Sequence, residues 1–452
     1  MSSPSPLPSP DSVLAQAKQL HLRGDRETAA RLYRMVLALA PADGAALCRL
    51  GVVGHQEGRS ADGLTWAERA LRVAAADPVA NSNAGAILSA LDRVGPALDR
   101  LRTAVTLAPA HATYLFNLAN TLQRDGRYDQ AITVYRRAIA LDPDASALHW
   151  NLGLALLRTG RLGEGWRQYE WRWHRPGFPG KTHLLPDWDG QAHSGRTLLV
   201  YSEQGFGDAI QFARYLPAIA GLGLRVVVEC QPALFRLFAT ILPDITVVPA
   251  GGATVEADLQ ASITSLPLLM GTASLADIPA VVPYFHPGEV AEPEPGDPPG
   301  PLKVAIAWTT STASATNHAR TCPLPLLASL AGIAGVRLHS VQVGPPAAEL
   351  AGRPEAIRDL SPDIHDFLDT ARLLAGMDLV VTVDTSIAHL AGALARPTWI
   401  LLPEQADWRW LVGREDSPWY PTARLFRQAR PGDWPGVADR VRTALERLAG
   451  SR

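Results

Sequence analysis

The arrangement of apolar and small residues changes near Gly195 and divides the chain of 452 residues into two parts. Before this point, small, bulky and proline positions recur with a fixed period, as in stacked pairs of helices. After it, short apolar runs such as TLLVY (residues 197–201) alternate with glycine turns and longer helical stretches. Strands that alternate with helices are typical of a doubly wound sheet of parallel strands. The pattern therefore predicts a helical part followed by an α/β part.

The helical part repeats every 34 residues. Two small positions define the repeat, the first with Ala17, Gly51, Gly85, Ala119 and Gly153 and the second with Ala29, Gly63, Ala97, Ala131 and Gly165. A bulky position carries Tyr33, Leu101, Tyr135 and Tyr169, and a closing position carries Pro41, Pro109 and Pro143. Small residues let two antiparallel helices approach closely, and proline ends each unit because it cannot continue a helix. The spacing predicts about five units, which begin near Pro10, Gly44, Pro78, Ala112 and Ser146.

These patterns predict the domain organisation. We expect residues 1–9 to be disordered, residues 10–175 to form the helical solenoid and residues 176–195 to connect it to the α/β part. Residues 286–301 carry six prolines, which is typical of a linker. The linker separates two α/β domains, residues 196–285 and residues 302–452, and a cleft is expected between them.

The last repeat runs into a cluster of aromatic residues, namely Trp166, Tyr169, Trp171 and Trp173. We interpret the cluster as a capping helix that packs on the next domain, with a ligand site as the alternative. A solenoid of this kind offers a concave groove for a peptide or a partner protein. The repeats themselves perform no chemistry.

Charge and cysteine content exclude several classes of function. The 42 basic and 44 acidic residues give a net charge of −2, so no basic field is available to hold a nucleic-acid backbone. Cys48, Cys230 and Cys322 are too scattered for a disulfide framework or a zinc site and suit a reducing compartment. The chain has no uncharged apolar run of about 18 residues, so no membrane span is predicted. The first ten residues lack the features of a secretory signal. A soluble, cytoplasmic protein is expected.

The strongest local motif is DTSIAHLAGA at residues 384–393. A buried strand is predicted to end in Asp384, Thr385 and Ser386, directly before a helix of small residues. The free N–H groups of that helix, the two hydroxyls and the positive end of the helix dipole favour an anion. His389 lies one turn further along and faces the same end. The alternative is that Asp384 or Thr385 only caps the helix.

A helix terminus is not sufficient to bind a diphosphate. It contributes about 0.3–1 kcal/mol, and up to ~2 kcal/mol in favourable geometry, whereas micromolar affinity requires roughly 8 kcal/mol. A further cation is therefore needed. Arg320, in the loop after the strand that ends at Trp308, is the best candidate because a guanidinium can bind phosphate through two hydrogen bonds. A surface arginine without a ligand is the alternative.

Other ligand motifs are poorly matched. The turn after the first α/β strand reads EQGFGD (residues 203–208), which is not the G-x-G-x-x-G of a dinucleotide site, and no P-loop motif occurs. Asp187-Trp188-Asp189 imitates a D-x-D metal motif, but it precedes the first strand and is followed by a turn signal. We therefore expect no metal site.

Several of these segments resemble a known family. The period of 34, with its small, aromatic and proline positions, resembles tetratricopeptide (TPR) repeats. The segments YSEQGFGDAIQFARYLP, SVQVG, DTSIAHLAGA, DWRWL and DSPWYPTARLFRQ look like bacterial TPR-containing glycosyltransferases, whose catalytic part is similar to the heptosyltransferase family with a GT-B fold. The resemblance covers about residues 10–449. It implies an α+α/β protein with an N-terminal TPR α-solenoid and a GT-B pair of Rossmann-like parallel α/β domains.

The resemblance also implies a donor site. In heptosyltransferases a D-T-G-x-x-H block cradles the nucleotide diphosphate of the donor, which implicates Asp384, Thr385, Ser386 and His389 on the side of residues 302–452. Ser386 stands where the family pattern has glycine. GT-B enzymes generally need no catalytic metal, because the helix dipole and basic groups neutralise the leaving diphosphate.

On the acceptor side, residues 196–285, the family carries a Gly-Asp pair whose aspartate is the general base for the acceptor hydroxyl. The pair maps to Gly207 and Asp208. Gly205 and Gly207 are expected to let the loop fold tightly, so that Asp208 faces the cleft at the start of the first helix. Capping of that helix is the alternative for Asp208, and Glu203 is the second candidate for the base.

Three further residues are weaker candidates for the donor's nucleotide or sugar. Gln342 ends a strand and either meets the nucleotide or is a satisfied strand-end amide. Arg409 lies in a loop expected to reach the cleft mouth. Trp308 begins a Trp-Thr-Thr sequence where relatives are expected to have Trp-Ala-Gly, and Gln260 stands where they are expected to have histidine.

Three functions are compatible with these residues. The first is a metal-independent glycosyltransferase that moves a sugar from a nucleotide-sugar, with no other cofactor, to a protein Ser or Thr recruited by the TPR groove. The second transfers the sugar to a saccharide or a lipid-linked glycan. The third is a non-catalytic TPR scaffold with a degenerate transferase-like domain. The exposed repeat ends permit self-association in each case.

Overall fold

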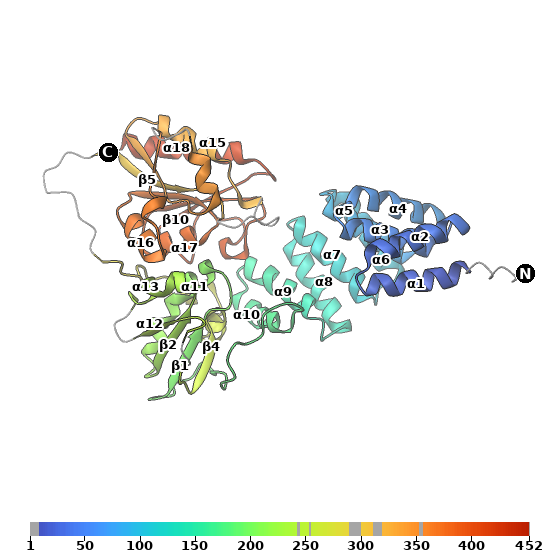
Figure 1. Cartoon of the computed structure of the whole chain (residues 1–452), viewed down its shortest axis with the longest axis horizontal. Helices are drawn as coiled ribbons and strands as arrows, with labels where there is room; N and C mark the ends of the chain where they lie inside the picture. Colours follow the sequence, from blue (N-terminus) through green and yellow to red (C-terminus); the bar gives the residue numbers. More distant parts are fainter. Residues whose placement is uncertain are drawn as a thin grey trace, which may run out of the picture. The chain divides into compact units, whose positions relative to one another are not determined.

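The computed structural model describes residues 9–241, 245–252, 255–288, 300–310, 319–351 and 356–451. The predicted disordered N-terminus and Pro-rich linker therefore lie mostly outside the described residues. The chain forms two compact units, Met1–Ala155 and Leu156–Arg452. Figure 1 shows the helices of the first unit in blue and cyan and the two sheets of the second in green to red.

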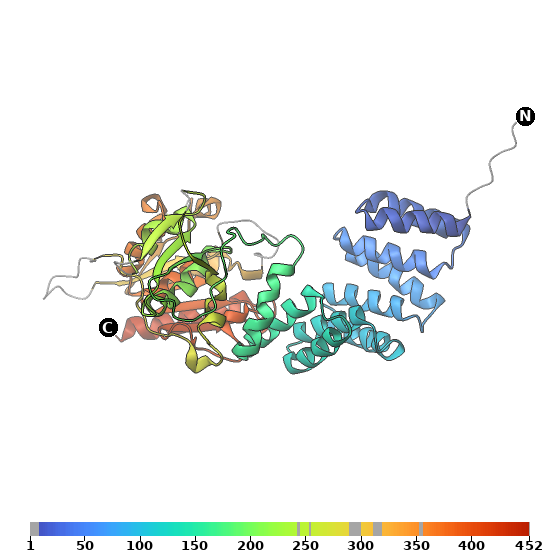
Figure 2. The same ribbon diagram turned by 90° about the horizontal axis from the view of Figure 1, so that it is seen from below.

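The first unit is built from antiparallel helix pairs that follow one another along the chain (Figure 2). Its helices are α1 (Pro10–Leu22), α2 (Arg26–Leu39), α3 (Gly44–Gln56), α4 (Ser60–Val73), α5 (Pro78–Ala90), α6 (Val94–Leu107), α7 (Ala112–Arg124), α8 (Tyr128–Leu141) and the greater part of α9 (Ser146–Arg158). Every odd-numbered helix begins at a residue where the period of 34 places the start of a unit. The predicted helical first part is confirmed.

Close contact between paired helices explains the small positions of the repeat. A Cβ atom on Gly63 of α4 would lie 2.6 Å from the carbonyl oxygen of Gly51 in α3. Ala29 and Ala97 occupy the same position in other repeats and are fully buried. The bulky position fills the space between helices, and Tyr33 is fully buried there. The small positions of the repeat are therefore explained by the close packing of the paired helices.

The second unit contains two parallel sheets. The first sheet has the order β3-β2-β1-β4, with strands β1 (Thr197–Tyr201), β2 (Arg225–Cys230), β3 (Thr246–Pro249) and β4 (Leu259–Ser262). Its helices include α11 (Phe206–Phe212), α12 (Leu216–Ala220), α13 (Phe235–Phe238) and α14 (Leu266–Leu269). The Gly207-Asp208 pair lies in the first turn of α11, directly after the loop that follows β1.

The second sheet has the order β10-β9-β8-β5-β6-β7 and is also fully parallel. Its strands are β5 (Leu302–Ala307), β6 (Val336–Ser340), β7 (Ile357–Asp359), β8 (Leu379–Val383), β9 (Thr398–Leu402) and β10 (Ala423–Arg427). Helices α15 (Leu324–Ala328), α16 (Phe367–Ala375), α17 (Ser386–Ala393) and α18 (Trp434–Gly450) connect or flank them. All five residues of β8 are buried, as expected for a central strand covered on both faces.

Helices α11 and α17 pack against each other and so join the two sheets. Because the strands of each sheet are parallel, their carboxyl ends meet at one edge, and both helices begin directly after such an edge. A second link lies nearby, where the guanidinium of Arg214 donates to the carbonyl oxygen of Trp419 (2.6 Å). The predicted α/β part with parallel strands is confirmed, and its two halves belong to one compact unit.

The aromatic cluster lies in this second unit. Helix α10 (Leu162–Tyr169) buries Trp166, whose ring contacts Trp408 (5.3 Å between centroids) and Phe212 (6.0 Å) in edge-to-face geometry. The observed packing agrees with a helix that docks on the α/β part and not with a ligand site. The second unit therefore begins at Leu156, before the solenoid boundary predicted at residue 175.

Among the described residues, no helix combines the length and the apolar character that crossing a bilayer requires.

Gly63→Ala should destabilise the first unit, because the added methyl group would collide with the backbone of α3. Overpacking of this kind costs about 1–3 kcal/mol. Amide hydrogen exchange in α3 and α4, measured by mass spectrometry, should therefore accelerate by roughly 5- to 150-fold. Gly95→Ala in α6 is the matched control, since a Cβ there has nothing within 4 Å. Equal exchange rates in both variants would contradict the packing explanation.

Candidate functional site

A cavity of about 620 Å³ lies at the carboxyl ends of β5, β6 and β8 and against the start of α11. Most of the residues predicted from the sequence line it, namely Gly205, Gly207, Asp208, Arg320, Gln342, Asp384, Thr385, Ser386, His389 and Arg409. The cavity also borders the start of α16, at Asp366 and Phe367. Residues from both α/β halves therefore line one cavity. It lies at the strand ends, where open α/β sheets commonly bind ligands.

The turn between β8 and α17 exposes backbone to this cavity. The hydroxyl of Thr385 accepts a hydrogen bond from the amide of Ile387 (3.3 Å), so Thr385 is the cap of α17. The capping alternative is thus correct for Thr385 and not for Asp384. Ser386 is the first residue of the helix, and its amide has no hydrogen-bond partner among the described residues. That amide is available to an anion in the cavity.

Asp384 and Arg320 form a pair at the cavity wall. The Nη1 atom of Arg320 lies 3.6 Å from Oδ2 of Asp384 and 3.5 Å from its carbonyl oxygen. Burial, with Asp407 nearby, raises the pKa of Asp384, whose side chain is only 5% exposed. Arg320 is 35% exposed. Asp384 therefore holds the arginine in place, while part of the guanidinium remains accessible to a ligand.

His389 is buried on the inner side of α17. Its Nδ1 lies 2.9 Å from the hydroxyl of Tyr420, and its ring stacks on Trp410 with 5.3 Å between centroids. Burial, followed by the positive charge of Arg409, lowers the pKa of His389 well below 6.5. The imidazole is therefore neutral at physiological pH. It lines the cavity as a hydrogen-bonding group and not as a cation.

Gly207 is needed for the approach of the two helices. A Cβ atom at this position would lie 2.8 Å from Cδ2 of His389, closer than side-chain atoms normally pack. The sequence predicts that Gly205 and Gly207 let the loop fold tightly; in the structure neither has a positive φ. Gly205 caps α11 in extended backbone, with φ at −72°. Glycine at 207 instead lets α11 meet α17.

Asp208 has two partners in the structure. Its Oδ2 accepts a hydrogen bond from the amide of Gly205 (3.0 Å), which caps α11, and its Oδ1 forms an ion pair with Arg409. The capping alternative and the place in the cavity are therefore both observed, since the carboxylate remains part of the cavity wall. The side chain is 16% exposed.

Arg409 bridges the two halves of the second unit. Its Nη1 donates to Oδ1 of Asp407 (2.7 Å), its Nε donates to Oε1 of Gln211 (2.8 Å), and its Nη2 contacts Asp208. Burial opposes the ionised forms, but the carboxylates outweigh it and raise the pKa of Arg409, while Arg409 in turn lowers the pKa of Asp407. The guanidinium also lies 4.3 Å from the ring centroid of Trp408. These contacts keep Arg409 charged at the cavity wall.

Segments in both parts of the chain match known protein families. Residues 349–402, which include β8, the Asp384–Ser386 turn and α17, match glycosyltransferase family 9 (heptosyltransferase). Residues 14–80 and 124–160 match tetratricopeptide repeats. The chain resembles a TPR-repeat glycosyltransferase. The likeness predicted from the sequence motifs is confirmed at this level, and the repeats together with the family match support a glycosyltransferase.

One curated protein is similar to part of this chain. Protein FlbA of Caulobacter vibrioides is 29% identical to this chain over 326 residues, which cover 64% of the chain and 53% of FlbA. The chain thus spans about half the length of this relative. Among solved structures, MamA from Desulfovibrio magneticus RS-1 matches 36% of the chain and 90% of its own, with 22% identity and a TM-score of 0.31. PilF of Pseudomonas aeruginosa matches 36% of the chain and 73% of its own, with 19% identity and a TM-score of 0.32.

The structure does not bring every candidate residue of this TPR-repeat glycosyltransferase-like chain to the cavity. The side chain of Glu203 is 4% exposed and contacts Arg172 (3.3 Å) and Thr264, away from the cavity lining. Trp308 is fully buried in the core beneath the second sheet. Both side chains therefore stabilise the fold instead of facing a ligand. We do not retain Glu203 as a candidate base.

Gln342 has an engaged carboxamide, although it lines the cavity. Its Oε1 accepts hydrogen bonds from the amides of Trp308 and Thr309, both at 3.1 Å. Its Nε2 donates to the carbonyl oxygen of Val343 (3.2 Å). The alternative of a satisfied strand-end amide therefore describes its contacts. Gln342 thus holds Trp308 and Thr309, the two residues directly after β5.

Gln260 and the D-x-D segment both have structural partners. Gln260 is buried in β4, and its Nε2 donates to the carbonyl oxygen of Leu185 (2.6 Å) and to Oδ1 of Asp187 (3.2 Å). It therefore anchors the connector beside the first sheet. Asp187 also pairs with Lys181, and Asp189 contacts His193 at 2.8 Å. The D-x-D segment thus has partners of its own within the connector.

Sequence reasoning missed Tyr420 and Arg214, which lie on the side of His389 that faces away from the cavity. Tyr420 and Arg214 are both almost fully buried, and the guanidinium lies 4.7 Å from the centroid of the tyrosine ring. The two residues are 206 positions apart, and both lie in segments that resemble the family, YSEQGFGDAIQFARYLP and DSPWYPTARLFRQ, but the resemblance assigned neither of them a role. No periodic pattern marks them. Only the packing of the two halves brings them together.

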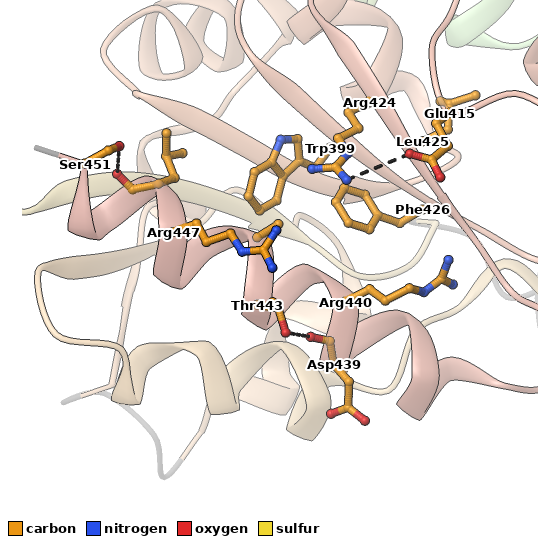
Figure 3. Close-up of a pocket in the computed structure, with 12 residues that line it drawn as sticks. Trp399, Glu415, Arg424, Leu425, Phe426, Asp439, Arg440, Thr443, Arg447 and Ser451 are labelled. Carbon is orange, nitrogen blue, oxygen red and sulfur yellow. Dashed lines mark hydrogen bonds and ion pairs between the residues drawn. The ribbon is translucent and has the colours of Figure 1, made fainter.

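A second cavity, of about 630 Å³, lies between β9, β10 and α18 (Figure 3). Trp399 and Phe426 form its apolar floor, and Arg424 lies beside Glu415 at its edge, with 3.9 Å between the charged groups. The lining contains none of the residues predicted from the sequence as site residues. The candidate site is therefore the 620 Å³ cavity at the strand ends.

Lowering the pH should destabilise the protein in part through His389. Because its folded-state pKa lies well below 6.5, the unfolded chain binds a proton below about pH 6.5 that the folded chain does not bind. The stabilisation is thus complete above about pH 6.5 and is lost as the pH falls below it. His389→Gln should show a flatter decline in the free energy of unfolding between about pH 7 and about pH 5 than the wild type, measured by denaturant titration.

The exposed His286→Gln is the control for this measurement and should keep the wild-type slope. Asp384, whose pKa is raised, acts with the opposite sign but is present in all three proteins. Identical slopes for the wild type and His389→Gln would contradict a neutral, buried His389.

Proposed function

We propose that this chain is a metal-independent glycosyltransferase of GT-B architecture, which binds a nucleotide-sugar in the 620 Å³ cavity and transfers the sugar to an acceptor. One observation carries the proposal. The cavity is lined by Ser386 and His389 of the segment that matches glycosyltransferase family 9 and, from the other sheet, by Asp208. A donor diphosphate and an acceptor hydroxyl could therefore meet there.

Three groups would bind the diphosphate. The free amide of Ser386 lies at the positive end of α17, Arg320 presents part of its guanidinium, and His389 offers a ring nitrogen. The helix end supplies up to ~2 kcal/mol, and charge-assisted hydrogen bonds from the arginine add about 1.5–3 kcal/mol. The remainder of the roughly 8 kcal/mol needed for micromolar affinity would come from contacts with the nucleoside and the sugar.

Asp208 would activate the acceptor. Its carboxylate takes the proton of the acceptor hydroxyl while the hydroxyl oxygen attacks the anomeric carbon of the donor sugar. The bond from that carbon to the diphosphate breaks, and the diphosphate leaves with the electron pair toward the amide of Ser386 and Arg320. Arg409, which is paired with Asp208, holds the carboxylate at the cavity wall before the acceptor binds.

For the acceptor, we propose a protein Ser or Thr that the TPR repeats recruit. The support is the presence of repeats in the same chain, since solenoids commonly bind peptide segments. Saccharide or lipid-linked acceptors are the competing possibility. Transfer of a radiolabelled sugar in a cell extract separates them, because the label would enter protein in the first case and the solvent-extractable or glycan fraction in the second.

We propose a cytoplasmic location on the basis of the cysteines. Cys48, Cys230 and Cys322 are all buried and free. Burial raises the pKa of the Cys48 thiol to about 11 and that of the Cys230 thiol to about 12, so neither is a reactive thiolate. Such cysteines suit a reducing compartment.

Asp208→Asn should separate binding from chemistry. The amide keeps the shape of the carboxylate but cannot accept a proton, so release of sugar from the donor should fall by roughly 10²- to 10⁴-fold. Thermal stabilisation by nucleoside diphosphates should persist, because the proposed diphosphate ligands are unchanged. Asp187→Asn is the control, since its carboxylate belongs to the connector, and it should retain both properties.

Two results would contradict the proposal. The lack of any thermal shift with a panel of nucleoside diphosphates would favour the non-catalytic scaffold. Unchanged turnover in Asp208→Asn would remove Asp208 as the base.

A further inference from the structure

The ring of His389 has two different surroundings at its two nitrogens. Nδ1 faces the protein interior and lies 2.9 Å from the hydroxyl of Tyr420. Nε2 has no hydrogen-bond partner among the described residues and lies on the side of Gly207, where the ring borders the cavity. The proton of a neutral imidazole can be on either nitrogen, and the partner of one nitrogen decides the state of the other.

We infer that Tyr420 is a positioning residue, whose hydroxyl donates to Nδ1 of His389 and so fixes the tautomer that presents an Nε2–H donor to the cavity. Tyr420 is fully buried and does not line the cavity, whereas its partner His389 does. The nature of the ligand, a diphosphate, rests on the proposed function. The tautomer itself does not.

Both partners are neutral, which limits the hydrogen bond to two arrangements. Burial lowers the pKa of His389 well below 6.5 and raises the pKa of Tyr420 well above 10. Either the phenol donates to Nδ1 and the ring carries its proton on Nε2, or Nδ1–H donates to the phenol oxygen and Nε2 has a lone pair. A charged pair is not one of the options.

The charge of Arg214 favours the phenol as donor. Its guanidinium lies over the face of the Tyr420 ring, 4.7 Å from the centroid. A cation in this position withdraws electron density from the phenol, which makes its O–H a better donor and its oxygen a poorer acceptor. Arg214 is itself held by the carbonyl oxygens of Trp419 (2.6 Å) and Gln211 (2.7 Å), so its position is fixed.

The surroundings of Nε2 point the same way. The charged groups that act on His389 are Arg409, Asp407, Arg214 and Arg320. Arg409 donates to Asp208, Asp407 and Gln211, and no hydrogen bond joins it to Nε2. A lone pair on Nε2 would therefore have no donor and would repel an anion in the cavity. An N–H at this position attracts the anion.

Close packing holds the pair in this orientation. A Cβ atom on Gly392 of α17 would lie 2.4 Å from Cγ of Tyr420, so the tyrosine ring lies directly on the helix backbone. Trp410 stacks on the imidazole with an interplanar angle of 21°. Neither ring can turn without displacing a neighbour. The direction of Nε2 is thus set by residues that have no contact with the ligand.

The tautomer can be measured directly in the full-length protein by long-range ¹H–¹⁵N correlation of ¹⁵N-histidine, with the His389 signals assigned from their loss in His389→Gln. We expect the wild type to show a protonated Nε2 and an unprotonated Nδ1. Tyr420→Phe should lose this fixed tautomer. Tyr215→Phe is the matched control, since it removes a similarly buried hydroxyl whose hydrogen-bond partner among the described residues is Thr272 (2.8 Å), and it should leave the His389 signals unchanged.

Binding of inorganic pyrophosphate, measured by calorimetry, tests the consequence. Tyr420→Phe should weaken binding by about 5-fold, as expected for the loss of one well-oriented hydrogen bond, and Tyr215→Phe should not. In a His389→Gln background the amide supplies its own N–H, so adding Tyr420→Phe should have no further effect. A merely structural role would weaken binding equally in both backgrounds.

Three results would overturn the inference: a protonated Nδ1 in the wild type, an unchanged Nε2–H tautomer in Tyr420→Phe, or an equal loss of pyrophosphate affinity in the two backgrounds. Failure of the wild type to bind either pyrophosphate or nucleoside diphosphates would instead remove the proposed donor site. In that case the tautomer measurement still decides the role of Tyr420.

Discussion

The contact between α11 and α17 is the constraint on which the candidate site depends. Helix α11 begins after β1 of the first sheet, and α17 begins after β8 of the second sheet. Gly207 allows the backbone of α11 to lie against His389 of α17. Without this approach, the turn at Ser386 and the carboxylate of Asp208 would not line one cavity. The candidate site is therefore a property of the joint between the sheets.

Charge compensation across this joint makes the contact tolerable. Asp208, Asp407 and Asp384 are all largely buried near the cavity, and unpaired buried carboxylates would be strongly destabilising. Arg409 offsets the first two and Arg320 the third. Such a network of alternating charges fixes the geometry of polar groups at the cost of desolvation. It also leaves two cations at the wall of a cavity that is proposed to receive a diphosphate.

The network changes how the individual residues are understood. Sequence motifs pointed to Asp384, Asp208 and Arg320 as groups that touch the ligand. The structure shows that Asp384 first of all holds Arg320, and that Asp208 both caps α11 and pairs with Arg409. Ser386 and His389 each have a hydrogen-bonding atom on the cavity side that has no partner among the described residues. Residues that the sequence motifs suggested as a single ligand-binding set therefore have different contacts: some hold neighbouring side chains in place, and others face the cavity.

The sequence by itself determined the helical repeats and the parallel strands. Both depend on local periodicity, since small residues every 34 positions and buried apolar runs of about five residues are visible without knowledge of distant contacts. The DTSIAH block was also readable, because strand, cap and helix start are consecutive residues. For the same reason the strand end and the helix start were predicted where β8 ends and α17 begins.

Only the tertiary structure decided which polar groups pair with one another. Arg409 contacts Asp208 across 201 positions, and Tyr420 contacts His389 across 31. Glu203, five residues from Asp208, turns instead toward Arg172. Such pairs form where the two α/β halves meet. The hydrophobic periodicity of the strands in one half carries no information about which residues of the other half they will contact. Buried polar groups are specific to a site because their partners come from distant segments.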